Sequence, residues 1–167
     1  MKILYMIGGT MGAGKTTVCQ SLKNKLNNSV FLDGDWCWDM NPFRVTDETK
    51  DMVLDNICHT LNNFLHCSEF EHIIFCWVMH EQSIIDSIKK RLELNGCKTA
   101  EFSLICSEEV LKKRLRADVE RGIRTEDVIG RSAARIPLYE KLDTVKIDVS
   151  EITADIAAEQ IIDAAEK

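Results

Sequence analysis

The chain has 167 residues, of which 45% are hydrophobic and 29% are charged, and its formal net charge at pH 7 is −6. This length and composition predict one globular domain with a sizeable core, so residues 1–167 are treated as a single domain. The acidic balance argues against a nucleic-acid partner, because proteins that bind a polyanion usually carry a basic excess.

The chain begins with the apolar run MKILYMIG, which is expected to form the first strand over residues 2–8. The run is too short to span a membrane and no cleavage site follows it, so we expect no membrane partner and no export. The seven cysteines are odd in number and include no CxxC pair. They favour reduced core thiols, which is typical of a cytoplasmic protein.

The next stretch, GTMGAGKT at residues 9–16, matches the P-loop pattern. Its glycines let backbone N–H groups turn toward a phosphate, and the positive end of the following helix favours the anion. Lys15 is expected to reach the β- and γ-phosphates of ATP, and the Thr16 hydroxyl to bind Mg²⁺. The residues predicted to hold ATP here are Gly9, Met11, Gly12, Ala13, Gly14, Lys15, Thr16 and Thr17.

Strands and helices alternate through the rest of the chain. We expect helices at about 17–26, from Thr46 onward, at 81–95, from Ser107 to about 121, from 123 to 139 and from Thr153, and strands at 29–33, 72–78, 99–106 and 144–149. This alternation predicts an α/β fold of three α/β/α layers with a five-stranded parallel sheet. Ligands of such folds bind outside the carboxyl ends of the strands.

An acidic pair follows the second strand at that edge, in the segment DGDWCWDMNPF. Asp33 and Asp35 flank a glycine, so in an extended chain they point to the same side, within reach of one metal and one substrate. Phosphoryl transfer to a hydroxyl needs a magnesium-linked carboxylate and, usually, a carboxylate that accepts the proton. We assign Asp33 to the first role and Asp35 to the second. The alternative is a turn with two solvated acids.

Four segments together resemble the shikimate kinase type of small-molecule P-loop kinase, a group that also includes gluconate kinase and chloramphenicol phosphotransferase. These segments are the P-loop, the DxD, the basic RLRADVERG at 114–122 and RIPLY at 135–139. The resemblance covers nearly the whole chain. It implies that Asp33 is linked to magnesium, that Asp35 faces the acceptor hydroxyl, and that a helical lid, at about residues 112–130, closes over ATP with an arginine.

The same resemblance assigns Arg121 to the lid, Arg114 to the neighbourhood of the adenine and Arg135 to the acceptor. A mobile lid can offset charge on the transferred phosphoryl group while it excludes water, and Gly122 is a candidate hinge. The alternative for the lid arginines is a solvated helical face that pairs with Asp118 and Glu120. The segment IDVSEIT at 147–153 resembles the adenine-side loop of the same kinases.

The acceptor side departs from shikimate kinase, because VMHEQ follows the third strand where that enzyme has a glycine triplet. Shikimate is therefore not the expected substrate. The predicted acceptor-site residues are Asp35, Trp36, Arg44, His80 and Arg135, with Trp38 and Phe43 nearby. Aromatic rings suit a planar or partly apolar acceptor such as a nucleoside, a nucleotide or an antibiotic-like molecule. The alternatives are that the tryptophans are core residues and that His80 caps a helix.

These residues predict an ATP-dependent phosphotransferase that moves the γ-phosphoryl group to a hydroxyl or a phosphate of a small molecule. The competing hypothesis is a P-loop switch or slow NTPase that acts through a protein partner. Its support is thin, because WVMHEQ at 77–82 lacks the usual Walker B aspartate and no NKxD segment occurs. The sequence identifies no protein partner.

Overall fold

Five parallel strands form the central sheet of the computed structural model, which describes all of residues 1–167. Their spatial order is β2-β3-β1-β4-β5, with β1 in the middle and buried along its whole length. The strands are β1 (Ile3–Gly9), β2 (Ser29–Asp33), β3 (His72–Trp77), β4 (Lys98–Ile105) and β5 (Val145–Asp148). The predicted α/β fold with a five-stranded parallel sheet is confirmed.

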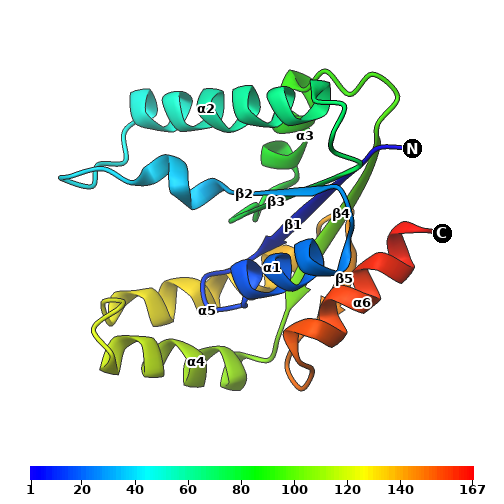
Figure 1. Ribbon diagram of the computed structural model, residues 1–167. Helices are drawn as coiled ribbons and strands as arrows, with labels where there is room; N and C mark the ends of the chain where they lie inside the picture. Colours follow the sequence, from blue (N-terminus) through cyan, green and yellow to red (C-terminus); the bar gives the residue numbers. More distant parts are fainter.

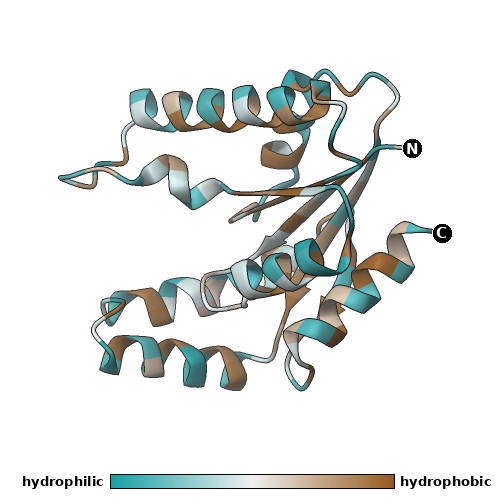
Figure 2. Ribbon diagram, in the orientation of Figure 1, coloured by the Kyte–Doolittle hydropathy of each residue, from teal (hydrophilic) through white to brown (hydrophobic).

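Helices cover both faces of this sheet (Figure 1). They are α1 (Lys15–Lys25), the short 3-10 helix η1 (Gly34–Trp38), α2 (Asp47–His66), α3 (Gln82–Arg91), α4 (Glu108–Glu120), α5 (Asp127–Glu140) and α6 (Ala154–Ala165). One core cluster joins the sheet to α1, α4 and α6, and a second joins it to α2, α3 and the end of α5. The hydrophobic residues of α2 line the side that faces the sheet (Figure 2).

Side-chain caps start three of the helices at the residues predicted from the sequence. Thr46, Ser107 and Thr153 each accept a hydrogen bond from the backbone N–H three residues later, at the first turns of α2, α4 and α6. Each bond satisfies a donor that a helix start would otherwise leave unpaired.

The predicted helix over 81–95 ends earlier, at Arg91. Leu92 is extended and buried in the core beside α2, and Asn95 and Gly96 have φ values of 47° and 85°. These two left-handed residues form the turn into β4, so Gly96 belongs to a loop and does not mark the end of the helix. The stretch expected from 123 likewise begins later, at Asp127. No helix has the combination of length and apolar character needed to cross a membrane.

Candidate active site at the carboxyl edge of the sheet

The segments predicted to form the active site lie at the carboxyl ends of three neighbouring strands. The P-loop joins β1 to α1, the DxD follows β2, and the VMHEQ segment follows β3. Because β3 lies between β2 and β1 and all three strands are parallel, their carboxyl ends lie side by side. The arrangement therefore gathers residues that are far apart in the sequence.

The P-loop depends on glycines in the left-handed region of backbone space. Gly12 has φ +82° and Gly14 has φ +88°. A Cβ added at Gly12 would lie 2.7 Å from Cδ2 of Leu115, so α4 packs directly on the loop. A Cβ at Gly14 would meet nothing within 4 Å, so that glycine is needed for its conformation. The loop thus has the curled backbone that binds phosphate in other proteins.

Lys15 is buried at the start of α1, and its Nζ donates to the carbonyl oxygen of Thr10 at 3.2 Å. Burial lowers the pKa of Lys15, while the charges of Asp35 and Asp33 act in the opposite direction. One long hydrogen bond does not offset the free energy that a buried ammonium group loses when it leaves water. An anionic ligand in the loop would supply the missing charge.

Asp33 is held with both carboxylate oxygens occupied. The Thr16 hydroxyl donates to Oδ2 at 2.7 Å, and the backbone N–H of Asp35 donates to Oδ1 at 3.0 Å. Asp33 is buried, with 5% of its surface exposed. A hydroxyl and a carboxylate side by side are hard oxygen donors of the kind that Mg²⁺ prefers, so these residues fit the predicted ion.

Asp35 lies in the first turn of η1 and lines a cavity of about 950 Å³ next to this pair. Partial loss of hydration and the charge of Asp33 raise the pKa of Asp35, against the opposing effects of Lys15, Arg124 and the Trp77 side chain. A carboxylate with a raised pKa accepts a proton more readily than an ordinary aspartate. The base role of Asp35 stays a prediction, which its position at the cavity supports.

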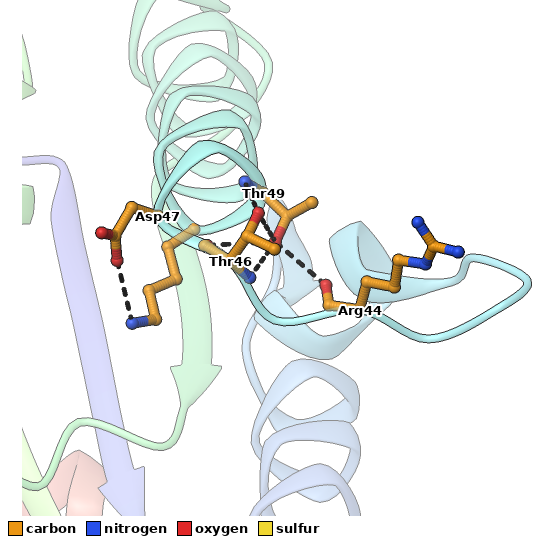
Figure 3. Close-up of polar contacts among 5 residues, drawn as sticks. Arg44, Thr46, Asp47 and Thr49 are labelled. Atoms are coloured by element: carbon orange, nitrogen blue, oxygen red, sulfur yellow. Dashed lines mark hydrogen bonds and ion pairs between the residues drawn. The ribbon is translucent and has the colours of Figure 1, made fainter.

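The same cavity includes most of the predicted acceptor residues. Trp36, Trp38, Phe43, His80 and Arg135 all line it. Arg44 does not, although its neighbours Phe43 and Val45 do. In Figure 3 the Arg44 side chain extends away from the start of α2. The role of Arg44 in acceptor binding therefore stays a prediction that the cavity lining does not support.

Other cavity residues were missed by sequence reasoning. These are Asp39, Val45, Lys50, Trp77, Val78, Ile84 and Arg131. Met11, which was assigned to the ATP side, also lines this cavity. Trp77 ends β3 beside β2, and a Cβ added at Gly34 would lie 2.6 Å from its Cγ; this contact depends on the pairing of β2 with β3, which the sequence alone does not provide. Lys50 and Arg131 carry no signal of their own, since each lies on an ordinary charged helix face.

A second cavity, of about 280 Å³, lies on the other side of the P-loop. It is lined by Ala13, Gly14, Thr17 and Arg114, together with residues of the 149–154 segment. The Arg114 Nη2 donates to the carbonyl oxygen of Val149 at 2.7 Å, which ties α4 to that segment. This is the region to which the resemblance assigned the adenine.

The two arginines near the turn between α4 and α5 differ in their surroundings. Arg121 is exposed at the end of α4 and forms no ion pair. Arg124 donates through Nε to Oδ2 of Asp118 at 3.2 Å, and its charge lowers the pKa of Asp35. Arg124 was not singled out from the sequence, although it lies only three residues after Arg121. Gly122, the predicted hinge, has φ +71°.

Comparison with known proteins places the chain in a family. Residues 6–136 match a family model described as an AAA domain (AAA_18). This match covers more than half of the chain, which therefore belongs to that family. No curated protein sequence matches the chain.

Solved structures share the fold at low sequence identity. A tunicamycin resistance protein from Deinococcus radiodurans superposes with a TM-score of 0.73 at 19% identity, covering 98% of this chain and 95% of that one. A gluconokinase from Sinorhizobium meliloti 1021 gives 0.69 at 19% identity, covering 97% and 93%. The APS kinase of Mycobacterium tuberculosis, solved with AMPPNP and APS, gives 0.69 at 16% identity, covering 99% and 98%. The protein thus has the fold of small-molecule P-loop kinases.

Proposed function

We propose that the protein is an ATP-dependent kinase that transfers the γ-phosphoryl group to a hydroxyl or a phosphate of a small molecule. The observation that carries the proposal is the 2.7 Å bond between Thr16 and Asp33, because it joins the P-loop to the acidic pair. Asp35 lies next to this pair and lines a cavity large enough for a second substrate. The kinase fold of the structural neighbours supports the same conclusion.

The P-loop is proposed to hold the phosphates of ATP through its backbone N–H groups and Lys15, with the adenine beside Arg114. The residues proposed to contact ATP are Gly9, Gly12, Ala13, Gly14, Lys15, Thr16, Thr17 and Arg114. Thr16 and Asp33 would hold Mg²⁺, which offsets phosphate charge when bound. The buried Lys15 and the Thr16–Asp33 donor set fit these groups.

For a hydroxyl acceptor, the acceptor oxygen forms a bond to the γ-phosphorus while the bond to the bridging β–γ oxygen breaks. ADP departs with that electron pair, and the hydroxyl proton passes to the Asp35 carboxylate. A phosphate acceptor, already ionised, has no proton to lose. We propose that Arg121 and Arg124 offset charge on the transferred phosphoryl group when the lid closes. Arg121 is exposed and has no ion-pair partner, and Arg124 is oriented by its hydrogen bond to Asp118.

Seven free thiols and a reaction that consumes ATP suit a cytoplasmic enzyme, which is the compartment we propose. The proposed acceptor is a small molecule, with no role for nucleic acid or a membrane.

The direct test is ADP production with ATP and Mg²⁺ across pools of nucleosides, nucleoside monophosphates, sugars, sugar acids and aromatic antibiotics. We expect at least one pool to raise turnover well above that of Lys15→Ala, which removes the phosphate-binding ammonium. Slow turnover that no pool changes, despite tight ATP binding, would favour a switch that acts through a protein partner.

A further inference from the structure

We propose that the acceptor is a flat, largely apolar molecule with two polar ends: a hydroxyl that receives the phosphoryl group at Asp35 and an anionic group bound by Arg135. This inference rests on the proposed kinase activity and narrows its acceptor. Its basis is the unequal distribution of aromatic, acidic and basic side chains around the 950 Å³ cavity.

One wall of the cavity is apolar and exposed. It comes from residues 36–45, where Trp36 is 55%, Phe43 is 65% and Val45 is 55% exposed. The rings of Trp38 and Phe43 lie 5.7 Å apart at an interplanar angle of 53°. Exposed apolar side chains gathered at one cavity mark a binding surface, and aromatic rings bind other flat groups by stacking and buried area.

This wall is held at both ends. At its start, the Asp35 N–H bonds to Asp33. At its end, the Thr49 hydroxyl accepts from the Thr46 N–H at 2.8 Å and donates to the Arg44 carbonyl oxygen at 2.9 Å, as Figure 3 shows. A loop fixed in this way loses little conformational entropy when a ligand binds, so its apolar side chains are prepared for one.

Basic residues line the cavity from α5. Arg131 is paired with Asp127 at 3.3 Å, whereas Arg135 forms no ion pair although it is half-buried. Its charge acts on His80, which shares the cavity wall and whose pKa is lowered by burial and by Arg135. A partly desolvated guanidinium without a carboxylate partner is a binding group for a carboxylate or a phosphate.

The part of the cavity lined by Asp33 and Asp35 disfavours an anionic group. Two carboxylates beside the reacting atom repel a second anion there, so a neutral hydroxyl is favoured over a phosphate as the accepting group. The hydroxyl oxygen bonds to the γ-phosphorus, its proton goes to Asp35, and ADP leaves. The anion of the acceptor then lies at Arg135, away from this end.

The size of the cavity agrees with such a molecule. About 950 Å³ is near the upper limit of ordinary small-ligand pockets and exceeds what a simple polyol fills. A ring that carries a separate anionic group uses the aromatic wall and the α5 side together. A compound with only one of these features leaves either the rings or Arg135 without a partner.

The test compares matched compounds that each retain a hydroxyl. Nucleoside 5′-monophosphates are set against their nucleosides and against ribose 5-phosphate, and hydroxyaryl carboxylic acids against their amides and against saturated ring hydroxy acids. We expect transfer to the anionic ring compounds of at least one series to have a kcat/KM about 10- to 100-fold above both counterparts. The two series distinguish a phosphate from a carboxylate as the anion.

Variants assign the preference to its residues. Arg135→Gln should remove the advantage of the anionic compound and leave the neutral one unchanged. Arg91→Gln, at an exposed arginine of α3 that lines neither cavity, should change neither. Equal kcat/KM for charged and neutral rings, for ring and saturated acids, or in Arg135→Gln and wild type, would overturn the inference.

Ligand-observed NMR with a non-hydrolysable ATP analogue separates this inference from the proposed function. Selective binding of anionic ring compounds without transfer of phosphate would remove the kinase proposal and leave the acceptor assignment of the cavity in place. Transfer of phosphate without selectivity for anionic ring compounds would keep the kinase proposal and remove the acceptor assignment.

Discussion

Asp33 and Asp35 are two residues apart but have different surroundings. Asp33 is buried and has both oxygens bonded, whereas Asp35 lines the cavity and its pKa is raised by partial loss of hydration and by Asp33. The first arrangement suits a fixed metal ligand and the second suits a base. These different environments support the distinct roles that we propose for two chemically identical side chains.

Replacing Asp35 by Asn keeps the shape of the side chain and removes the base. We expect Asp35→Asn to lower kcat for a hydroxyl acceptor by about 10²- to 10⁴-fold, with the ATP dissociation constant nearly unchanged. Steady-state rates and ATP titrations measure the two effects, and Asp51→Asn on the exposed face of α2 is the control. Wild-type transfer by Asp35→Asn would refute the assignment.

The raised pKa of Asp35 predicts the pH dependence of transfer. The base must be ionised, so kcat/KM should fall as the pH drops through a pKa above the ordinary aspartate value of about 3.9. Trp77 lowers the pKa of Asp35, so Trp77→Phe should move this acid limb to higher pH. A limb that stays in place or moves to lower pH in Trp77→Phe would show that another group controls it.

The capped start of α2 is hydrogen-bonded to the end of the 36–45 segment that forms the apolar wall of the cavity. Thr46→Ala removes the side-chain cap and should cost about 1 kcal/mol of unfolding free energy. Urea denaturation measures this cost. Thr60→Ala is the matched control, because the Thr60 hydroxyl only bonds back to the Asn56 carbonyl oxygen within the same helix, and it should have little effect. Equal losses in the two variants would argue against a specific capping role.

The P-loop and α4 are coupled through Gly12. Gly12→Ala combines a strained φ of +82° with a methyl group 2.7 Å from Leu115, whereas Gly14→Ala introduces only the strain. Left-handed strain costs about 1–2 kcal/mol, so we expect Gly14→Ala to lose that much stability and Gly12→Ala to lose more. Denaturant midpoints test the order, and a smaller loss in Gly12→Ala would show that α4 yields to the added methyl group.

Over the whole molecule, local patterns predicted the elements better than their contacts. Thr46, Ser107 and Thr153 were recognisable as helix starts because the capping interactions that they form are local. Trp77 and Arg124 act on Asp35 from β3 and from beyond α4, so their roles arise only once the sheet order and the lid position are known. A site assembled from three strand ends is visible in the sequence chiefly through its motifs.

The end of α3 and the position of Arg44 show the same limit. The sequence offered Gly96 as a stop, but Leu92 leaves the helix to join the core beside α2. Arg44 was assigned to the acceptor site because of its neighbours in the sequence, whereas the cavity is lined by Phe43 and Val45 on either side of it. For the end of α3, the packing of Leu92 in the core outweighed the local stop signal.

Ligand binding should stabilise the whole protein through Lys15. Burial lowers the pKa of Lys15, so folding opposes its charged form, and this cost is present at every pH below the ordinary lysine pKa, including neutral pH. Without ligand, Lys15→Met should therefore melt at a higher temperature than wild type. With ATP and Mg²⁺ at about 100 times the dissociation constant, wild type should gain about 2.7 kcal/mol and Lys15→Met should gain little. Thermal melts with and without ATP test both statements.

The central claim is that the phosphate reaches a small molecule. The most direct measurement incubates the protein with Mg²⁺, ATP labelled in its γ-phosphate and the acceptor pools, and follows the label by chromatography and mass spectrometry. We predict label covalently attached to an acceptor with wild type, and none above background with Lys15→Ala or, for a hydroxyl acceptor, Asp35→Asn. Label found only as inorganic phosphate, at a rate that no acceptor changes, would contradict the account.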